Sequence, residues 1–589
     1  MSTPHQSREL QSRVLRIYLR DYVSEYLEAR GQQDAHPRFL NDALPYWILV
    51  EKALTVHTPA EHGTVPISIA ERLGWPQTKL LITPQIISQT EGIDLPCSLP
   101  LFKGCVKIDP GIPTLSDEMF RHLQDALFFD MMDCDQTTVT DSAFEHLAKL
   151  LELNIARCDQ TTITDSAFKH FSNLSGLYMS DCTQTTITDG AFSHLTDISF
   201  LLMRSCSQTT ITDNAFRHLK KLLDLDMAEC DQTTITDKAF SHLANLSILN
   251  MMDCTQTTIT DAAFSHLTNL SILDMMDCSQ KTITDRAFAH LTNLRSLTIA
   301  ACNQTTITDA SFSYLANLTS LDMTSCDQST ITDAGFSHLA SLQALRMMTC
   351  PQTTITDAAF SHLAKLQTLD MLACNQTTIT DAAFSHLTNL RTLCMANCNQ
   401  KTITDAAFSH LTNLRSLHMA SCYQSTITNE AFRHMINLKS LNLVSCRVTD
   451  DAFIHLGNLS YLDMSFSFQT TVTDACFSSL TNLRTLLIMG CNQTTITDAA
   501  FSHLANLQTL DMMGCNQTTI TDGAFSHLTN LRTLYMRDCT QTTISNAAFC
   551  HLTNLRTLCV RDCTQKTISN AALSHLTNLT SLTPPSKEG

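Results

Sequence analysis

Residues 366–389 read LQTLDMLACNQTTITDAAFSHLTN, and residues 390–413 follow with the closely similar LRTLCMANCNQKTITDAAFSHLTN. Working outward in both directions, the same 24-residue unit recurs in about 20 copies, the first beginning at Leu115 and the last at Ile568. A fixed period of this length is the signature of a repeat array, in which each unit contacts only its neighbours. One elongated repeat domain is therefore expected from a chain of 589 residues.

A column of cysteines marks the period. It runs at intervals of 24 from Cys134 to Cys446 and resumes from Cys491 to Cys563, with Ser467 in the intervening slot. The unit at 446–466 is shorter than the others, because CRVTDDAF lacks a three-residue insert that is present in CNQTTITDAAF. Since the period continues after this deletion, the insert is predicted to lie in a loop.

The first part of the unit has the pattern of a short strand. Leu366, Leu369 and Met371 are apolar, and the alternation at the last two predicts a strand with one buried face. Cys374 follows where the chain must turn, and a small thiol that packs as an apolar group suits a buried turn.

The second part of the unit has helical spacing after a polar QTT loop. Asp381 or its neighbour Thr380 can cap a short helix. Phe384 and Leu387 are three residues apart and share the inward face, whereas His386 is expected to point outward. Stacked units would form a parallel sheet on one side and short helices on the other.

The pattern LxxLxMxxC…ITDxAFxxLxxL resembles the cysteine-containing leucine-rich repeat of the substrate-receptor subunits of F-box ubiquitin ligases, most closely in LKSLNLVSCRVTDDAFIHL (438–456). ITDAAF is also similar to the AF-containing repeats of BspA-like surface proteins. The resemblance covers about Leu115 to Leu582. It implies an α/β horseshoe solenoid with a concave parallel sheet and convex helices, a ligand-binding role for the concave face, and no enzyme activity. The insert and the Met at the second strand position depart from the pattern.

The two ends differ from the repeats. Residues 1–110 are expected to form a mainly helical and irregular N-terminal cap, 111–583 the solenoid, and 584–589 a short tail. ALPYWILVEKAL contains a Leu-Pro pair, but the rest of an F-box is absent. The last repeat has no capping unit, so self-association through this open edge is a hypothesis.

The charge and composition exclude several partners. A net charge of −18 argues against a general nucleic-acid binder and against docking on anionic lipid. No apolar run is long enough to span a membrane, and the first residues lack the apolar core of a signal peptide. A cytoplasmic location is expected, where the 24 cysteines stay reduced.

Regular columns of reactive residues invite chemical interpretations. The cysteine column and a parallel histidine column, from His122 to His575, could bind metal, but single ligands in a row do not converge on one ion. Rows such as Thr402-Ile403-Thr404 resemble ice-binding surfaces, although loop threonines usually form turns. Neither Cys nor His marks one catalytic site, so the expectation is a protein without enzyme activity, cofactor or metal.

A partner is predicted to bind where the concave positions vary between repeats. The column between the strand apolar residues varies most, and the two positions before the cysteine face the same way. Aromatic and Arg anchors of the hot-spot type lie beside an acidic stretch that favours a basic partner. The candidate residues are Tyr178, Phe200, Leu202, Arg204, Asp224, Asp226, Glu229, Asn250, Asp253, Asp274, Asp277, Asp322, Arg346 and Asp370.

The function predicted from the sequence is a non-catalytic scaffold that binds a protein partner on the concave face. A substrate-receptor subunit of a ubiquitin-ligase complex is the first alternative, and it requires residues 1–110 to bind an adaptor. A surface-adhesion or ice-binding solenoid is the second alternative, and it requires export.

Overall fold

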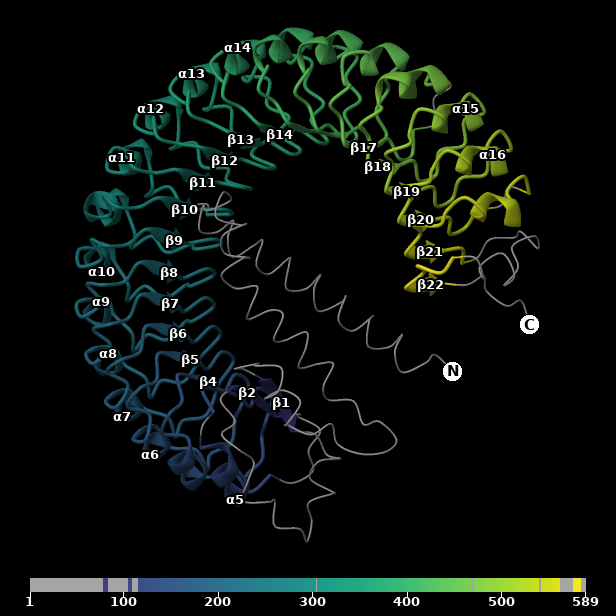
Figure 1. Ribbon diagram of the computed structural model, residues 1–589. Coiled ribbons are helices and arrows are strands. Elements are labelled where there is room, and N and C mark those ends of the chain that lie inside the picture. Colours follow the sequence, from purple (N-terminus) through teal and green to yellow (C-terminus); the bar gives the residue numbers. More distant parts are fainter. Residues whose placement is uncertain are drawn as a thin grey trace, which may run out of the picture. The chain divides into compact units, whose positions relative to one another are not determined.

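The computed structural model describes residues 115–124, 126–302, 304–467, 471–539, 542–561 and 576–583, together with the backbone of 78–82 and 104–108. The chain divides into two compact units, Met1–Leu321 and Asp322–Gly589. In each unit, parallel strands line the inner side and short helices of four to six residues line most of the outer side (Figure 1). This is the α/β leucine-rich-repeat solenoid predicted from the sequence.

Unit 1 is built from short strands alternating with short helices. Its strands are β1 (Thr78–Ile82), β2 (Gly104–Ile108), β3 (Phe128–Asp130), β4 (Glu152–Asn154), β5 (Gly176–Tyr178), β6 (Phe200–Leu202), β7 (Asp224–Asp226), β8 (Ile248–Asn250), β9 (Ile272–Asp274) and β10 (Ser296–Thr298), and β11 (Ser320–Asp322) contains the boundary. Its helices, with η for 3-10 turns, are α5 (Asp117–Phe120), η2 (Arg121–Leu123), η3 (Asp141–His146), α6 (Asp165–Phe168), α7 (Asp189–Phe192), α8 (Asp213–Phe216), α9 (Asp237–Phe240), α10 (Asp261–Phe264), η4 (Asp285–His290) and α11 (Asp309–Phe312).

Unit 2 repeats the same alternation. Its strands are β12 (Ala344–Arg346), β13 (Thr368–Asp370), β14 (Thr392–Cys394), β15 (Ser416–His418), β16 (Ser440–Asn442), β17 (Tyr461–Asp463), β18 (Thr485–Leu487), β19 (Thr509–Asp511), β20 (Thr533–Tyr535), β21 (Thr557–Cys559) and β22 (Ser581–Thr583). Its helices are α12 (Asp333–Phe336), α13 (Asp357–Phe360), α14 (Asp381–Phe384), η5 (Asp405–His410), η6 (Asn429–His434), η7 (Asp450–Phe453), η8 (Asp474–Ser479), α15 (Asp498–Phe501), α16 (Asp522–Phe525) and η9 (Asn546–Phe549).

Equivalent residues of successive repeats pair across the sheet. Leu369 of β13 lies opposite Leu393 of β14, and both side chains are fully buried. Across the short repeat the paired strands are closer together in the sequence, yet Leu441 still pairs with Leu462. The deletion therefore does not disturb the strand register, as predicted for a loop.

The helical side is fastened by Thr and Asp. Thr380 is the N-cap of α14, and its hydroxyl accepts the Ala382 N–H at 3.2 Å. Asp381 does not cap its own helix but binds Thr404 of the next repeat. The Thr402 hydroxyl donates to the Ile379 carbonyl at 2.8 Å. These threonines form hydrogen bonds within the helical side and between neighbouring repeats. Because their hydroxyl groups are used in this way, the structure argues against a row of threonines that binds ice.

The cysteine column is part of the interior. The Cys398 thiol donates to the Met371 carbonyl of the preceding repeat at 2.9 Å, and burial raises the pKa of Cys374 and Cys446 to about 11. Within the described ranges, no cysteine forms a disulfide bond. Buried neutral thiols bonded to carbonyls are inert packing groups, so the packing interpretation of this column holds.

The polar loop is less exposed than its sequence suggests. Gln376 is only 5% exposed, and the equivalent glutamines from Gln160 to Gln424, together with Gln493 and Gln517, are also buried. Gln232 donates its Nε2 to the Cys206 carbonyl at 2.7 Å. For Gln376, neither amide atom has a hydrogen-bond partner within the described part of the chain.

Two strands lie in the region expected to be helical and irregular. Thr78–Ile82 (β1) pairs in parallel with Gly104–Ile108 (β2), and β2 pairs with β3, so strand pairing begins ahead of the first cysteine repeat. The sequence offered no repeat signal there. The remaining residues of the 1–110 cap and the 584–589 tail lie outside the described residues, and those domain assignments stay predictions.

Candidate partner-binding surface

All of the residues predicted to bind a partner lie on the strand side at half-buried or exposed positions. They do not form a single cluster. Most belong to unit 1, whereas Asp322, Arg346 and Asp370 belong to unit 2. The candidate site on unit 1 is therefore considered first.

Many of the acidic side chains have a local backbone role. Asp226 and Asp274, at the ends of β7 and β9, each accept the N–H of the residue two positions later, at 3.0 and 2.9 Å. Asn250 makes the same bond on β8, and Asp322 and Asp370 make it in unit 2. This Asx interaction ends the strand. The recurrence of Asp and Asn in this column thus has a structural cause. Because one side-chain oxygen accepts the backbone hydrogen bond, at most the other oxygen or nitrogen of the side chain is left for a partner.

A second set of acids occupies a turn with unusual backbone geometry. Glu229, Asp253 and Asp277 precede the cysteine with φ of 57°, 53° and 56°. Asp tolerates this left-handed conformation better than most residues. The acidic stretch of unit 1 is thus partly a product of turn chemistry.

The predicted anchor Arg204 is already engaged. Its guanidinium pairs with Glu229, and the Ser205 hydroxyl donates to the other carboxylate oxygen of Glu229 at 2.8 Å. These bonds lower the pKa of Glu229. Arg204 and Glu229 therefore present a neutral pair to a partner, and neither is a free charge.

Beside this pair, an aromatic and a carboxyl group are held together. The Tyr178 hydroxyl donates to Glu152 at 3.0 Å, and the Tyr178 ring packs edge-on against Phe128 with centroids 6.3 Å apart. Gly176 makes room for this arrangement, since a Cβ there would lie 3.2 Å from Glu152 Cγ. Burial raises the pKa of Glu152.

Three large side chains are partly exposed on the adjacent strands β5 and β6. Tyr178 of β5 pairs with Leu202 of β6 across the sheet. Phe200 pairs with Gly176 in the same way, and its side chain is 36% exposed. Asp224 and Asp226 pair with Phe200 and Leu202 from β7. We name Tyr178, Phe200 and Leu202 the apolar patch; its rim is acidic, and it suits a partner with an apolar anchor flanked by basic residues.

One pair of reactive residues was missed because Cys and His recur in nearly every unit. Cys394 and His418 lie outside the two recurrent columns, on adjacent strands, with Sγ 3.7 Å from Nδ1. Burial raises the pKa of Cys394 to about 11, with Asp370 adding to the effect. A thiol that stays protonated at neutral pH is a weak nucleophile. Within the described residues, no group of three or more His, Cys, Asp or Glu is placed to hold a metal ion.

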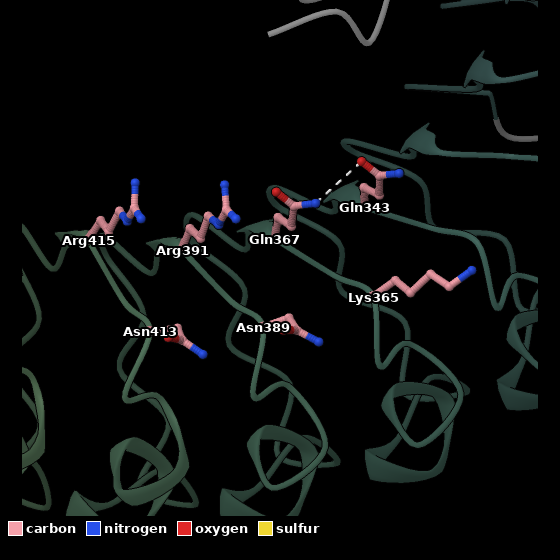
Figure 2. Close-up of a pocket in the computed structure, with 7 residues that line it drawn as sticks. All are labelled: Gln343, Lys365, Gln367, Asn389, Arg391, Asn413 and Arg415. Atoms are coloured by element: carbon pink, nitrogen blue, oxygen red, sulfur yellow. Dashed lines mark hydrogen bonds between the residues drawn. The ribbon is translucent and has the colours of Figure 1, made fainter. Parts of the chain in front are cut away.

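A second surface was also missed, on the flank of unit 2 where the chain enters the strands. A hollow of about 330 Å³ there is lined by cationic and amide side chains, among them Lys365, Arg391 and Arg415 (Figure 2). The signal in the sequence was the recurrence of LRTL and LRSL in the second half of the chain. Across the described ranges, no helix is long and apolar enough to cross a membrane.

Comparisons with known proteins agree with the fold. A family model described as a BspA-type leucine-rich-repeat region matches residues 104–223, 233–361, 329–460 and 401–531. A second model, described as a leucine-rich repeat, matches residues 505–564. Comparison with curated protein sequences gives no match.

Solved structures of the same architecture are similar to this chain. The mouse RP105/MD-1 complex contains a chain that is 16% identical, with a TM-score of 0.57, over 81% of this chain and 92% of that chain. The glycosylated Toll–Spatzle complex from Drosophila contains one that is 17% identical, with a TM-score of 0.50, over 77% and 61%. At these identities the likeness shows the fold alone.

Proposed function

Because this chain belongs to the proteins with BspA-type leucine-rich-repeat regions, we propose that it is a non-catalytic scaffold that binds a protein partner through the strand face of unit 1. The observation that carries the proposal is the apolar patch, three large side chains left partly exposed on adjacent strands. Single exposed apolar residues are ordinary on a protein surface, whereas a group of them within a polar rim is typical of an interface.

The charge around the apolar patch favours a basic partner. Asp224 and Asp226 border it, and Asp274 adds a further carboxylate two strands away. Arg204 does not offset these charges fully, since Glu229 is paired with it. A partner with Lys or Arg around an apolar anchor would be complementary.

The experiment that tests this function is capture of partners by the full chain, followed by mass spectrometry. Phe200→Ser with Leu202→Ser removes two of the three side chains of the apolar patch, and Asp226→Asn with Asp274→Asn removes two charges. The Asn variants are chosen because Asn250 makes the same backbone bond at the equivalent position, so strand ends are preserved. Tyr423→Ser, which removes an aromatic residue that is 61% exposed in unit 2, is the matched control.

A protein that is retained by wild type and by Tyr423→Ser, but lost with the Phe200 and Leu202 changes, supports the function. Weakening of the same interaction by the two Asn changes supports the basic character of the partner. Equal capture by all variants refutes the assignment of the partner to this surface.

The BspA-type match favours one further candidate, adhesion at a cell surface, which keeps the binding role but changes the location. We favour the cytoplasm, because a reducing compartment suits the many cysteines, which form no disulfide bonds in the described ranges. Labelling of intact cells with an antibody decides between the two locations. The substrate-receptor alternative depends on residues 1–110; capture of a ligase adaptor that is lost when these residues are deleted would support it.

A further inference from the structure

The residue that immediately precedes each strand changes character between the two units. At β3 to β10 of unit 1 it is small, hydroxylated or aliphatic, with Arg295 as the one cation among these eight described positions. Six of the eleven equivalent positions of unit 2, before β12 to β22, are cations, and none of the eleven is acidic. We name these six the cationic row: Arg391, Arg415, Lys439, Arg484, Arg532 and Arg556.

The side chains of the cationic row are exposed and have no partner among the described residues. Each of the six is an exposed residue. By contrast, Arg157 and Arg204 on the strand face of unit 1 pair with Asp133 and Glu229. Unpaired cations in a row, within a chain of net charge −18, create a local positive surface on an acidic protein.

Two hollows lie along the cationic row, and both lack carboxylates. The first, of about 330 Å³, contains Arg391 and Arg415, which extend in the same direction from successive turns, with Lys365 on the next turn (Figure 2). The second, of about 470 Å³, contains Lys439 and Arg484. The other lining groups of both hollows are Asn, Gln and Ser side chains.

The asparagine side chains that line the first hollow are held in place by hydrogen bonds. Asn389 donates to the Ala364 carbonyl and Asn413 to the Thr388 carbonyl, each at 2.9 Å. Figure 2 shows these amides as a second line of side chains beside the arginines. Each asparagine is thus held by the preceding repeat, and the arginines beside it project from a rigid base.

We propose that the cationic row binds an extended acidic segment of a partner protein. Adjacent strands are about 4.8 Å apart, so Arg391, Arg415 and Lys439 present three charges at nearly constant spacing. A segment that runs across the repeats can place carboxylates against them, and guanidinium groups bind carboxylates with two parallel hydrogen bonds. This site goes beyond the partner proposed for unit 1 and has the opposite charge preference.

The lining favours a protein segment over a single-stranded nucleic acid. Proteins that bind single strands without sequence preference combine a positive groove with aromatic side chains on which bases stack. Neither hollow is lined by an aromatic residue. Carboxylates need only the cations and the amide donors that are present.

Fluorescence anisotropy of the full chain with a labelled octaglutamate peptide tests the proposal, with octaglutamine as the uncharged reference. Arg391→Gln, Arg415→Gln and Lys439→Gln are combined in one variant. The matched control combines Lys401→Gln, Arg433→Gln and Arg447→Gln, which removes three exposed cations of the same unit that are not in the cationic row. Circular dichroism verifies that both variants are folded.

We expect octaglutamate to bind, octaglutamine not to bind, and the cationic-row variant to weaken binding about tenfold, as three exposed charge contacts allow. The control variant should change binding less than about threefold, and binding should weaken with salt. Absence of octaglutamate binding, or an equal loss in both variants, overturns the proposal. A thymidine octanucleotide that binds more tightly than the peptide, and is released by the same variant, overturns it in favour of a nucleic-acid site.

Discussion

The carboxylate of Asp381 accepts two hydrogen bonds from Thr404 in the following repeat, 2.7 Å from its backbone nitrogen and 2.6 Å from its hydroxyl. The same hydroxyl accepts the Ala406 N–H, so Thr404 links a neighbouring repeat to its own helix. Stability in a solenoid is approximately a sum of repeat terms and nearest-neighbour terms. This contact is one of the nearest-neighbour terms on the helical side.

Replacing Asp381 with Ala should therefore weaken one junction. The Thr404 N–H and hydroxyl lose their acceptor in a half-buried setting, and we expect a cost of about 1–2 kcal/mol. Hydrogen exchange of the Thr404 amide should accelerate, while amides several repeats away keep their protection. Asp451→Ala, which removes an exposed acid at the second position of η7, serves as the control. Equal acceleration in both variants would contradict this role.

The turn before each cysteine leads to a second prediction. Ala373 has φ of 56° and Gly514 has φ of 67°. Left-handed backbone costs an L-residue about 1–2 kcal/mol, which Gly avoids at the expense of greater freedom in the unfolded chain. Ala373→Gly should be neutral or stabilising by up to about 1 kcal/mol, and Gly514→Ala should destabilise by a similar amount.

Gly490 distinguishes conformational strain from crowding. It also has positive φ, but a Cβ there would lie 2.8 Å from the Phe466 ring, whereas at Gly514 the nearest atom is 3.8 Å away. Gly490→Ala should therefore destabilise more than Gly514→Ala in chemical denaturation. Equal losses at the two sites would show that the Phe466 ring moves aside freely.

Thiol reactivity should follow burial. The cysteine column is buried from Cys134 to Cys539, and burial raises the pKa of Cys374 and Cys491 to about 11, so few thiolates exist at neutral pH. Cys550 is exposed. Brief treatment of the native protein with iodoacetamide should alkylate Cys550 well before Cys374 or Cys491, as read by peptide mass spectrometry. Denaturant should abolish the difference, and rapid native alkylation of Cys374 would contradict the packing described above.

The fold was predictable because repetition averages out local ambiguity. A single LQTLDMLAC segment is too short to assign alone, but in about 20 copies the positions of Leu369, Cys374 and Phe384 define an inner face unambiguously. The expectation of a curved, horseshoe-like solenoid came only from the resemblance to leucine-rich repeats. β1 and β2 were not predicted, since their sequences do not share the repeat.

The candidate sites were predictable only in part. Sequence variation located the column of partly exposed residues on the strands. It could not show that Asp226 and Asp274 accept hydrogen bonds from nearby backbone N–H groups, or that Arg204 is paired with Glu229. Those facts depend on side-chain rotamers and on contacts with the neighbouring repeat. The cationic row was visible as a recurring letter in the sequence, yet its separation from carboxylates required the structure.

Asp226 provides a pH-dependent prediction. Burial raises the pKa of its carboxyl group, so the folded state binds this proton more tightly than the unfolded state. The free energy of unfolding should then fall as pH rises from the ordinary carboxyl range, near 4, towards the folded pKa. Asp226→Asn keeps the backbone bond and removes this penalty.

The variant should be more stable than wild type at pH 7, and the difference should vanish near pH 3, where both forms are neutral. Urea unfolding at several pH values measures this. Asp451→Asn removes one exposed charge and controls for net charge alone. A gain that is the same at pH 3 and pH 7 would not support a raised pKa at Asp226.

Buried amides provide the last prediction. Gln376 is 5% exposed with neither amide atom bonded to the described protein, whereas Gln232 donates to the Cys206 carbonyl. A buried polar group without a partner costs about 1–3 kcal/mol, and an apolar group of the same shape avoids that cost. Gln376→Met should therefore raise the urea midpoint. Gln232→Met removes a bond as well, so its gain should be smaller or negative. If Gln376→Met destabilises as much as Gln232→Met, then both glutamines must be satisfied in solution, with buried water as the partner of Gln376.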